Sequence, residues 1–216
     1  MNILSKSVFA LLLFASKCSA FGSIAPSQEV LQFEGIAPQG LGSAFLTGTF
    51  TEGNFEVFTP NGQWVDSAHP DLGIEHPSNG TDWFLNNNTG GIIISRIDSS
   101  PFFLQSFEAT EYTYVLPGNH AIFVDATRTD GTQISAAFMT DARPAYIVPE
   151  FQLFTLPGDW LQMPLSSVTI TAPNNGFAID DIRLLPVPEP KGVVMGCLSC
   201  MGAAAISSRR LRRPQV

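Results

Sequence analysis

The chain has 216 residues, enough for one domain of moderate size between two unusual ends. All nineteen acidic residues lie between Glu29 and Glu189, where the only basic residues are four arginines, so this stretch carries a net charge of −15 and no lysine. A nucleic-acid binder needs a basic face to neutralise phosphates, so the composition excludes that class of function.

Residues 1–20 are predicted to be a secretory signal peptide. Lys6 supplies the positive charge, residues 8–15 form an apolar stretch too short to span a bilayer, and small residues precede a cleavage site after Ala20. A buried N-terminal helix is the alternative interpretation of this segment. A signal peptide predicts that the rest of the chain is exported from the cytoplasm.

Residues 21–186 alternate short apolar runs with turns rich in Pro, Asn, Asp and Gly, and none of these runs has a helical period longer than two turns. The predicted strands are Val30–Phe33, Ser43–Phe50, Asn54–Thr59, Gly91–Ile97, Phe102–Glu108, Tyr112–Val115, His120–Thr127, Thr132–Met139, Phe151–Phe154, Ser167–Thr171 and Phe177–Leu184. Many short strands in one domain predict an all-β body, an antiparallel β-sandwich of the jelly-roll type.

The longest stretch of this body without a predicted element runs from Asp66 to Asn88. Long loops on a sandwich often carry function, and this one holds Trp83 close to three asparagines. Trp83 is therefore a candidate ligand-binding residue, because its indole ring could stack on a sugar. A place in the core is the alternative for Trp83, and equally for Trp64 and Trp160.

The last predicted strand breaks the in-out alternation of a β-strand at Asp180-Asp181. The apolar residues before this pair share one face of the strand, and those after it share the other. Either a β-bulge shifts the register there, or one face carries a carboxylate in an otherwise apolar row. A buried carboxylate has to be paired or bound to a metal ion.

This strand resembles the closing strand, apolar-Asp-Asp/Asn-apolar, of jelly-roll carbohydrate-binding modules and MAM domains. In the sugar-binding modules an aspartate there often helps to hold a structural Ca²⁺ with an acidic residue near the first strand. The resemblance implies a Ca²⁺ site made by Asp180 and Glu34, and carboxylate oxygens suit that ion. The alternative is that the Asp pair faces solvent or pairs with Arg183 or Arg143.

The search for a catalytic site is negative. The sequence has no Gly-x-Ser-x-Gly, His-Glu-x-x-His or phosphate-loop motif. Its body has no lysine, and its cysteines (Cys18, Cys197 and Cys200) lie in the two ends, so Schiff-base and thiolate nucleophiles are excluded from the body. We expect no catalytic residue, although a carboxylate pair for glycoside hydrolysis stays open.

The C-terminal end predicts a membrane anchor. Residues 192–208 carry no charge over a length at the lower limit for a transmembrane helix, and Arg209, Arg210, Arg212 and Arg213 follow. The arginines place this end in the cytoplasm and the acidic body outside. A buried C-terminal helix of a soluble protein is the alternative.

The tripeptide Pro188-Glu189-Pro190 is followed by the apolar segment and then by the arginine cluster. With its parts in this order, the stretch of residues 187–216 resembles the PEP-CTERM sorting signal of Gram-negative bacteria. The resemblance implies an exosortase, a membrane-embedded enzyme that recognises the tripeptide and processes the protein during export. Two prolines hold the tripeptide extended and accessible beside the membrane.

These patterns together predict an exported cell-surface or extracellular-matrix protein that passes through an inner-membrane-anchored precursor. Its sandwich would have a non-catalytic binding or structural role, with extracellular polysaccharide as the candidate partner. A secreted polysaccharide-active hydrolase on the same sandwich is the alternative.

Overall fold

The computed structural model describes residues 27–36, 43–45, 48–60, 63–65, 77, 79–86, 91–111, 120–141, 144, 146–172 and 177–188. These residues form thirteen strands and one short 3₁₀ helix, η3 (Trp160–Gln162). Within this described part, no helix has the length and apolar character needed to cross a membrane. The predicted signal peptide, the segment 192–208 and the arginine cluster lie outside it, as does the sorting tripeptide apart from Pro188.

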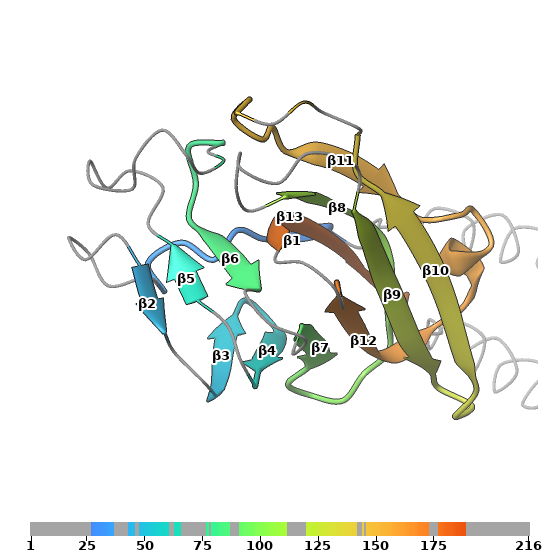
Figure 1. Ribbon diagram of the computed structural model, residues 1–216. Helices are drawn as coiled ribbons and strands as arrows, with labels where there is room; N and C mark the ends of the chain where they lie inside the picture. The colour runs from blue at the N-terminus through green and yellow to red at the C-terminus, as the bar shows by residue number, and fades with distance from the viewer. Residues whose placement is uncertain are drawn as a thin grey trace, which may run out of the picture.

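All described strand pairs are antiparallel, and they form one continuous thirteen-stranded sheet that folds into two layers, called here the first and the second sheet (Figure 1). The first sheet has the order β2 (Ser43–Phe45), β5 (Gln63–Val65), β6 (Trp83–Asn86), β13 (Phe177–Pro186), β8 (Phe102–Glu111) and β11 (Gln152–Thr155), and β1 (Glu29–Leu31) also pairs with β13. The second has the order β3 (Gly48–Glu52), β4 (Phe55–Thr59), β7 (Ile92–Arg96), β12 (Leu165–Thr171), β9 (Ala121–Arg128) and β10 (Gln133–Met139). The two sheets join where Leu165 pairs with Phe102.

Aromatic rings from both sheets fill the space between them, which makes the body a sandwich. Phe55 of β4 meets Phe102 of β8 with ring centroids 5.2 Å apart, and Phe107 of β8 meets Phe138 of β10 at 5.4 Å. Both pairs are edge-to-face, an arrangement that aromatic rings favour. Alternation places the apolar residues on this inner face, so the all-β sandwich predicted from the sequence is confirmed.

Three details of the predicted elements are wrong or incomplete. The predicted strand Ser43–Phe50 is two strands in different sheets, β2 and β3. The predicted loop from Asp66 to Asn88 contains strand β6, which pairs with both β5 and β13. Strand β5 was not predicted, because three residues are too short for a periodic pattern. The predicted strand Tyr112–Val115 lies outside the described residues.

Candidate functional site

The broken alternation of the closing strand is a β-bulge. Asp180 pairs with Glu108 and Arg183 pairs with Ser106, so β13 has one residue more than β8 between these two pairs. Asp181 takes up the extra residue with a left-handed backbone, φ 45°. The bulge lets the apolar residues on both sides of it face the same core, which resolves the conflict seen in the sequence.

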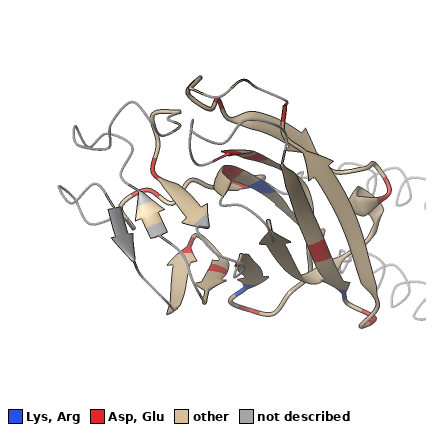
Figure 2. Ribbon diagram, viewed as in Figure 1, with Lys and Arg blue, Asp and Glu red and all other residues tan. Residues whose placement is uncertain are grey.

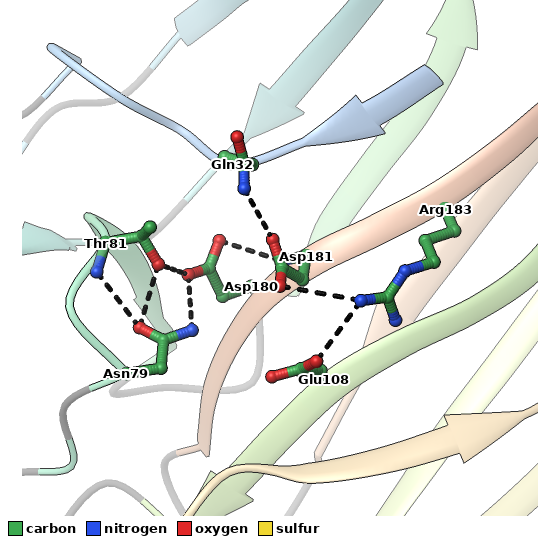
Figure 3. A network of polar contacts seen from close by, with 7 residues as sticks. All are labelled: Gln32, Asn79, Thr81, Glu108, Asp180, Asp181 and Arg183. Carbon is green, nitrogen blue, oxygen red and sulfur yellow. Dashed lines mark hydrogen bonds and ion pairs between the residues drawn. The ribbon is translucent and has the colours of Figure 1, made fainter. Parts of the chain in front are cut away.

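Asp180 is fully buried, so the bulge and the buried carboxylate occur together. One carboxylate oxygen accepts a hydrogen bond from Asn79 Nδ2 at 2.8 Å and another from Thr81 Oγ1 at 2.5 Å, and the second oxygen accepts from the Asp181 amide at 2.7 Å (Figure 3). Burial outweighs these hydrogen bonds and raises the pKa of Asp180 to about 7. No described cation forms an ion pair with this carboxylate.

Asp181 belongs to a second part of the same network. Its carboxylate accepts a hydrogen bond from Gln32 Nε2 at 3.0 Å and lies 3.7 Å from the Arg183 guanidinium, which is 3.4 Å from Glu108 (Figure 3). Pairing with Arg183, one of the sequence alternatives, is therefore confirmed for Asp181. The two neighbouring aspartates have different roles: one is half-buried and paired with a cation, the other is buried without one.

Glu34 and Asp180, the predicted calcium ligands, hold the same short segment, residues 79–82. Glu34 Oε1 accepts a hydrogen bond from the Asp82 amide at 3.1 Å, and Asp82 Oδ2 accepts one from the Gly35 amide at 3.0 Å. Asp180 accepts a hydrogen bond from Thr81, the residue before Asp82. The segment that leads into β6 is thus held by the turn after the first strand and by the last strand, and Glu34 itself is exposed.

The three tryptophans are core residues. Trp64, Trp83 and Trp160 are 1%, 0% and 4% exposed, so the core alternative is confirmed for all of them. Trp83 packs with Leu85 and Ala178 in a small cluster on the outer side of the first sheet, and its ring lies 6.3 Å from that of Phe151. It offers no exposed ring to a ligand in this structure.

The outer face of the second sheet is open and polar. The strand registers place Phe58, Ile93, Thr169, Asp125 and Ser135 in one row across it. Around this row, most of the outward-facing side chains of β3, β4, β7, β9 and β12 are short and hydroxylic: Thr49, Thr51, Ser95, Thr127, Ser167 and Thr171. On the edge strand β10, Ala137 and Met139 also face outward, and Met139 is 52% exposed. Such a face can accept hydrogen bonds from, and donate them to, a hydroxyl-rich ligand.

Two phenyl rings interrupt this polar face. Phe58 on β4 is 41% exposed and Phe123 on β9 is 37% exposed. Three strand spacings separate β4 from β9, about 14 Å, and Phe123 lies two residues, about 7 Å, along the strand from the row of Phe58, which puts the two rings roughly 16 Å apart. Two aromatic platforms at this separation could each contact one ring of an extended chain of sugars.

Asp and Glu far outnumber Lys and Arg over the described strands (Figure 2), and by the burial patterns the outward-facing described residues of this sheet include carboxylates and no lysine or arginine. Glu56 and Asp125 point outward, and Asp125 accepts a hydrogen bond from Ser135 Oγ at 2.5 Å. The arginines of these strands, Arg96 and Arg128, occupy positions of the opposite parity. Electrostatics therefore disfavours an acidic ligand on this face.

Reasoning from the sequence missed three buried or half-buried carboxylates that hold the backbone or neighbouring hydroxyls. Asp82 is described above; Glu52 accepts hydrogen bonds from the amides of Gln32 and Phe33, each at 3.0 Å. Buried Glu111 accepts from the hydroxyls of Thr110 and Thr140. No motif marks these residues, because each of their contacts spans distant parts of the chain or lies at a strand end.

Comparison with known proteins gives fold-level likeness alone. No family model matches the sequence, and no curated protein does. The xylan-binding family 22 module from Paenibacillus barcinonensis Xyn10C aligns at 11% identity with a TM-score of 0.38, covering 77% of this chain and 98% of that one. The family 11 module from Clostridium thermocellum, solved with a β-1,3-1,4-mixed-linked tetrasaccharide, aligns at 13% identity with a TM-score of 0.32, covering 76% and 99%.

The body is similar to carbohydrate-binding β-sandwiches. A third similar structure joins a family 22 module to a GH10 module in Clostridium thermocellum Xyn10B, solved with xylohexaose; identity is 10% and the TM-score 0.35. That alignment covers 77% of this chain but only 29% of the larger protein. All three TM-scores are below 0.5, so these likenesses by themselves do not indicate what this chain binds.

Proposed function

We propose that this chain is an exported, non-catalytic β-sandwich that binds a neutral polysaccharide on the outer face of its second sheet. The observation that carries the proposal is the pair of exposed rings, Phe58 and Phe123, set in a field of short hydroxyl side chains. Aromatic rings stack on the apolar faces of sugars, and hydroxyl and carboxylate groups bond to sugar hydroxyls.

The charge of the face favours a neutral glycan over an acidic one. Glu56 and Asp125 would repel a uronic-acid or sulfated chain, whereas carboxylates accept strong hydrogen bonds from neutral hydroxyls. The same two carboxylates do not form a hydrolytic pair. Their strands are three spacings apart, roughly 14 Å, whereas glycosidase carboxylates stand about 5–9.5 Å apart. We therefore propose that this face binds the polysaccharide without hydrolysing it.

Affinity measurements on the full chain test the site. Xylohexaose and a mixed-linked glucan tetrasaccharide serve as neutral probes, and an oligogalacturonate as the acidic probe. We expect Phe58→Ala and Phe123→Ala each to weaken binding of a neutral probe by about tenfold, the loss of one stacking contact. Leu161→Ala is the matched control, because Leu161 is also 37% exposed but lies on η3. Unchanged affinity in both Phe variants would contradict the site, and preference for the acidic probe would contradict the ligand class.

We further propose that the chain is sorted by an exosortase-type enzyme after export by its signal peptide, and that it ends at the cell surface or in the extracellular matrix. Support comes from the order of tripeptide, apolar segment and arginine cluster in residues 187–216. Pro188, the first residue of the tripeptide, is exposed and lies two residues beyond the end of the closing strand β13. An extended, exposed substrate is what a processing enzyme requires.

Calcium at Asp180 and Glu34 also remains a proposal. The buried Asp180 carboxylate has no compensating positive charge among the described residues, and a bound cation would supply one. Neither is there, among those residues, a group of three or more acidic, His or Cys side chains suited to a metal. Amide and backbone oxygens would therefore have to complete the ligand set, as Ca²⁺ permits. The ion would tie the first and last strands to the segment before β6.

A further inference from the structure

Strand β10 is an open edge of the second sheet. Within the described part of the chain it pairs with β9 alone, over seven consecutive residues, Gln133–Met139, without a register shift. It is the longest of the edge strands described: β3 has five residues and β11 four. An edge strand presents a row of backbone N–H and C=O groups that can pair with another strand.

The hydrogen-bond pattern shows which groups face outward. The Thr140 amide donates to the His120 carbonyl at 3.0 Å, and the Arg128 amide donates to the Thr132 carbonyl at 2.8 Å. Hydrogen-bonded pairs alternate along an antiparallel ladder, so the even-numbered residues of β10 bond to β9. The N–H and C=O groups of Gln133, Ser135, Ala137 and Met139 therefore point away from the sheet, toward the open edge.

The core beneath this edge is incompletely covered. Ile122, Val124 and Ala126 on β9 are at most 3% exposed, whereas the inward-facing residues of β10 are only half-buried. Those residues are Ile134, Ala136 and Phe138, and all three pack against the main core. A further strand along β10 would remove their remaining apolar surface from water.

The edge lacks the features that usually prevent strand pairing. Residues 133–139 contain no charge, no proline and no bulge, and their centre is the small triplet Ser135-Ala136-Ala137. The rest of the acidic body, with its net charge of −15 between Glu29 and Glu189, repels another copy of itself. An uncharged seven-residue edge is thus a place where two copies can approach without opposing carboxylates at the contact.

We propose that two copies of this chain associate through β10, antiparallel, with a two-fold axis at Ala136. This register pairs all seven residues: Ser135 lies opposite Ala137 of the second copy, and Gln133 lies opposite its Met139. The outward backbone groups then bond to one another, and Ile134 meets the second copy's Phe138 across the axis. The two second sheets become one continuous sheet, and their open faces join side by side.

Sedimentation equilibrium of the full chain in a mild detergent tests the association. We expect a concentration-dependent dimer, weakened at least tenfold in Ala137→Pro, because proline removes an outward N–H that bonds to nothing within the sheet. Ala137→Lys, a charge at the same place, should act in the same way. Ala137→Ser, which keeps the N–H, is the control and should associate like the wild type. A monomer at every concentration, or a dimer unaffected by both Pro and Lys, would overturn the proposal.

Disulfide formation tests the register. In a background with Cys18, Cys197 and Cys200 changed to Ser, Ala136→Cys should oxidise to a covalent dimer. Directly opposed residues of a non-hydrogen-bonded pair lie about 4.5 Å apart between Cα atoms, within disulfide range. Gln133→Cys should not, because the two copies of residue 133 would be roughly 20 Å apart along the strands. Equal cross-linking of both variants, or cross-linking of Gln133→Cys alone, would refute this register.

Discussion

The substitution Asp180→Asn measures how much an ionised carboxylate, buried without a cation, lowers the free energy of unfolding. Burial raises the pKa of Asp180 from 3.8 to about 7 in the folded chain. Between these two pH values the folded state binds a proton that the unfolded state releases. The stability that this proton confers is fully present below pH 3.8 and is lost as the pH rises through 7. The free energy of unfolding should fall by about 4 kcal/mol over this range, because each tenfold change in proton affinity is worth about 1.4 kcal/mol.

The assay is urea unfolding of wild type and Asp180→Asn from pH 3 to pH 8 in the presence of a chelator. At low pH the variant should be less stable by about 1 kcal/mol, because its amide nitrogen would face the Asn79 amide group that now donates to the carboxylate. Above pH 7 the order should reverse, since Asn carries no charge to desolvate. The difference between the two curves should change by about 4 kcal/mol across this range.

Two further measurements make the test sharper. Thr81→Val removes a hydroxyl that donates to the Asp180 carboxylate, so it should move the loss of stability to higher pH. If the site holds Ca²⁺, that ion should restore wild-type stability at pH 8 more than Mg²⁺ does at matched ionic strength, and it should leave Asp180→Asn unchanged. Parallel curves for wild type and Asp180→Asn at all pH values would refute the reasoning.

The remaining predictions concern backbone strain, sorting and topology. Gly91→Ala should lower the free energy of unfolding by about 3 kcal/mol, because φ is +64° and the new Cβ would stand 2.4 Å from a backbone carbonyl oxygen. Gly131→Ala is the control: φ is +83° but the space around it is open, so this substitution should cost about 1 kcal/mol in the same unfolding assay. Glu189→Ala should leave the precursor at full length in the membrane fraction on immunoblots, whereas normal maturation would make the tripeptide a mere linker. A reporter enzyme that works only outside the cytoplasm should be active when fused after Leu185 and inactive after Val216, and the reverse pattern would overturn the orientation.

Local pattern was enough to predict most of the strands. Apolar residues at every second position mark a strand with one buried face, and that signal needs no knowledge of partners. It located the closing strand and, through the failure of its alternation at Asp180-Asp181, the bulge and the buried carboxylate. A break in a periodic pattern is itself local information, because it requires either an extra residue in the strand or a polar group buried on the apolar face.

Position in the tertiary structure decided what the pattern could not. Strand β6 is too short and too apolar on both faces to alternate, and it is a strand because β5 and β13 pair with its two edges. Trp83 is core because residues distant in sequence cover the outer side of its sheet. The sequence around a tryptophan is the same whether other strands cover its ring or leave it exposed, so it could not distinguish a core residue from a ligand-binding one.

The charge distribution and the two ends can be read from the sequence alone, because the order of an apolar N-terminal segment, an acidic body, a tripeptide, a second apolar segment and an arginine cluster is linear information. The signal peptide and the sorting signal that this order indicates stay predictions. The candidate binding face and the open edge are not linear. Phe58 and Phe123 share a face only because three strand pairings lie between β4 and β9, and β10 is an edge only because no described strand pairs with its second side. Long-range pairing, which closes loops of many residues, therefore determines where the proposed binding face and the open edge lie.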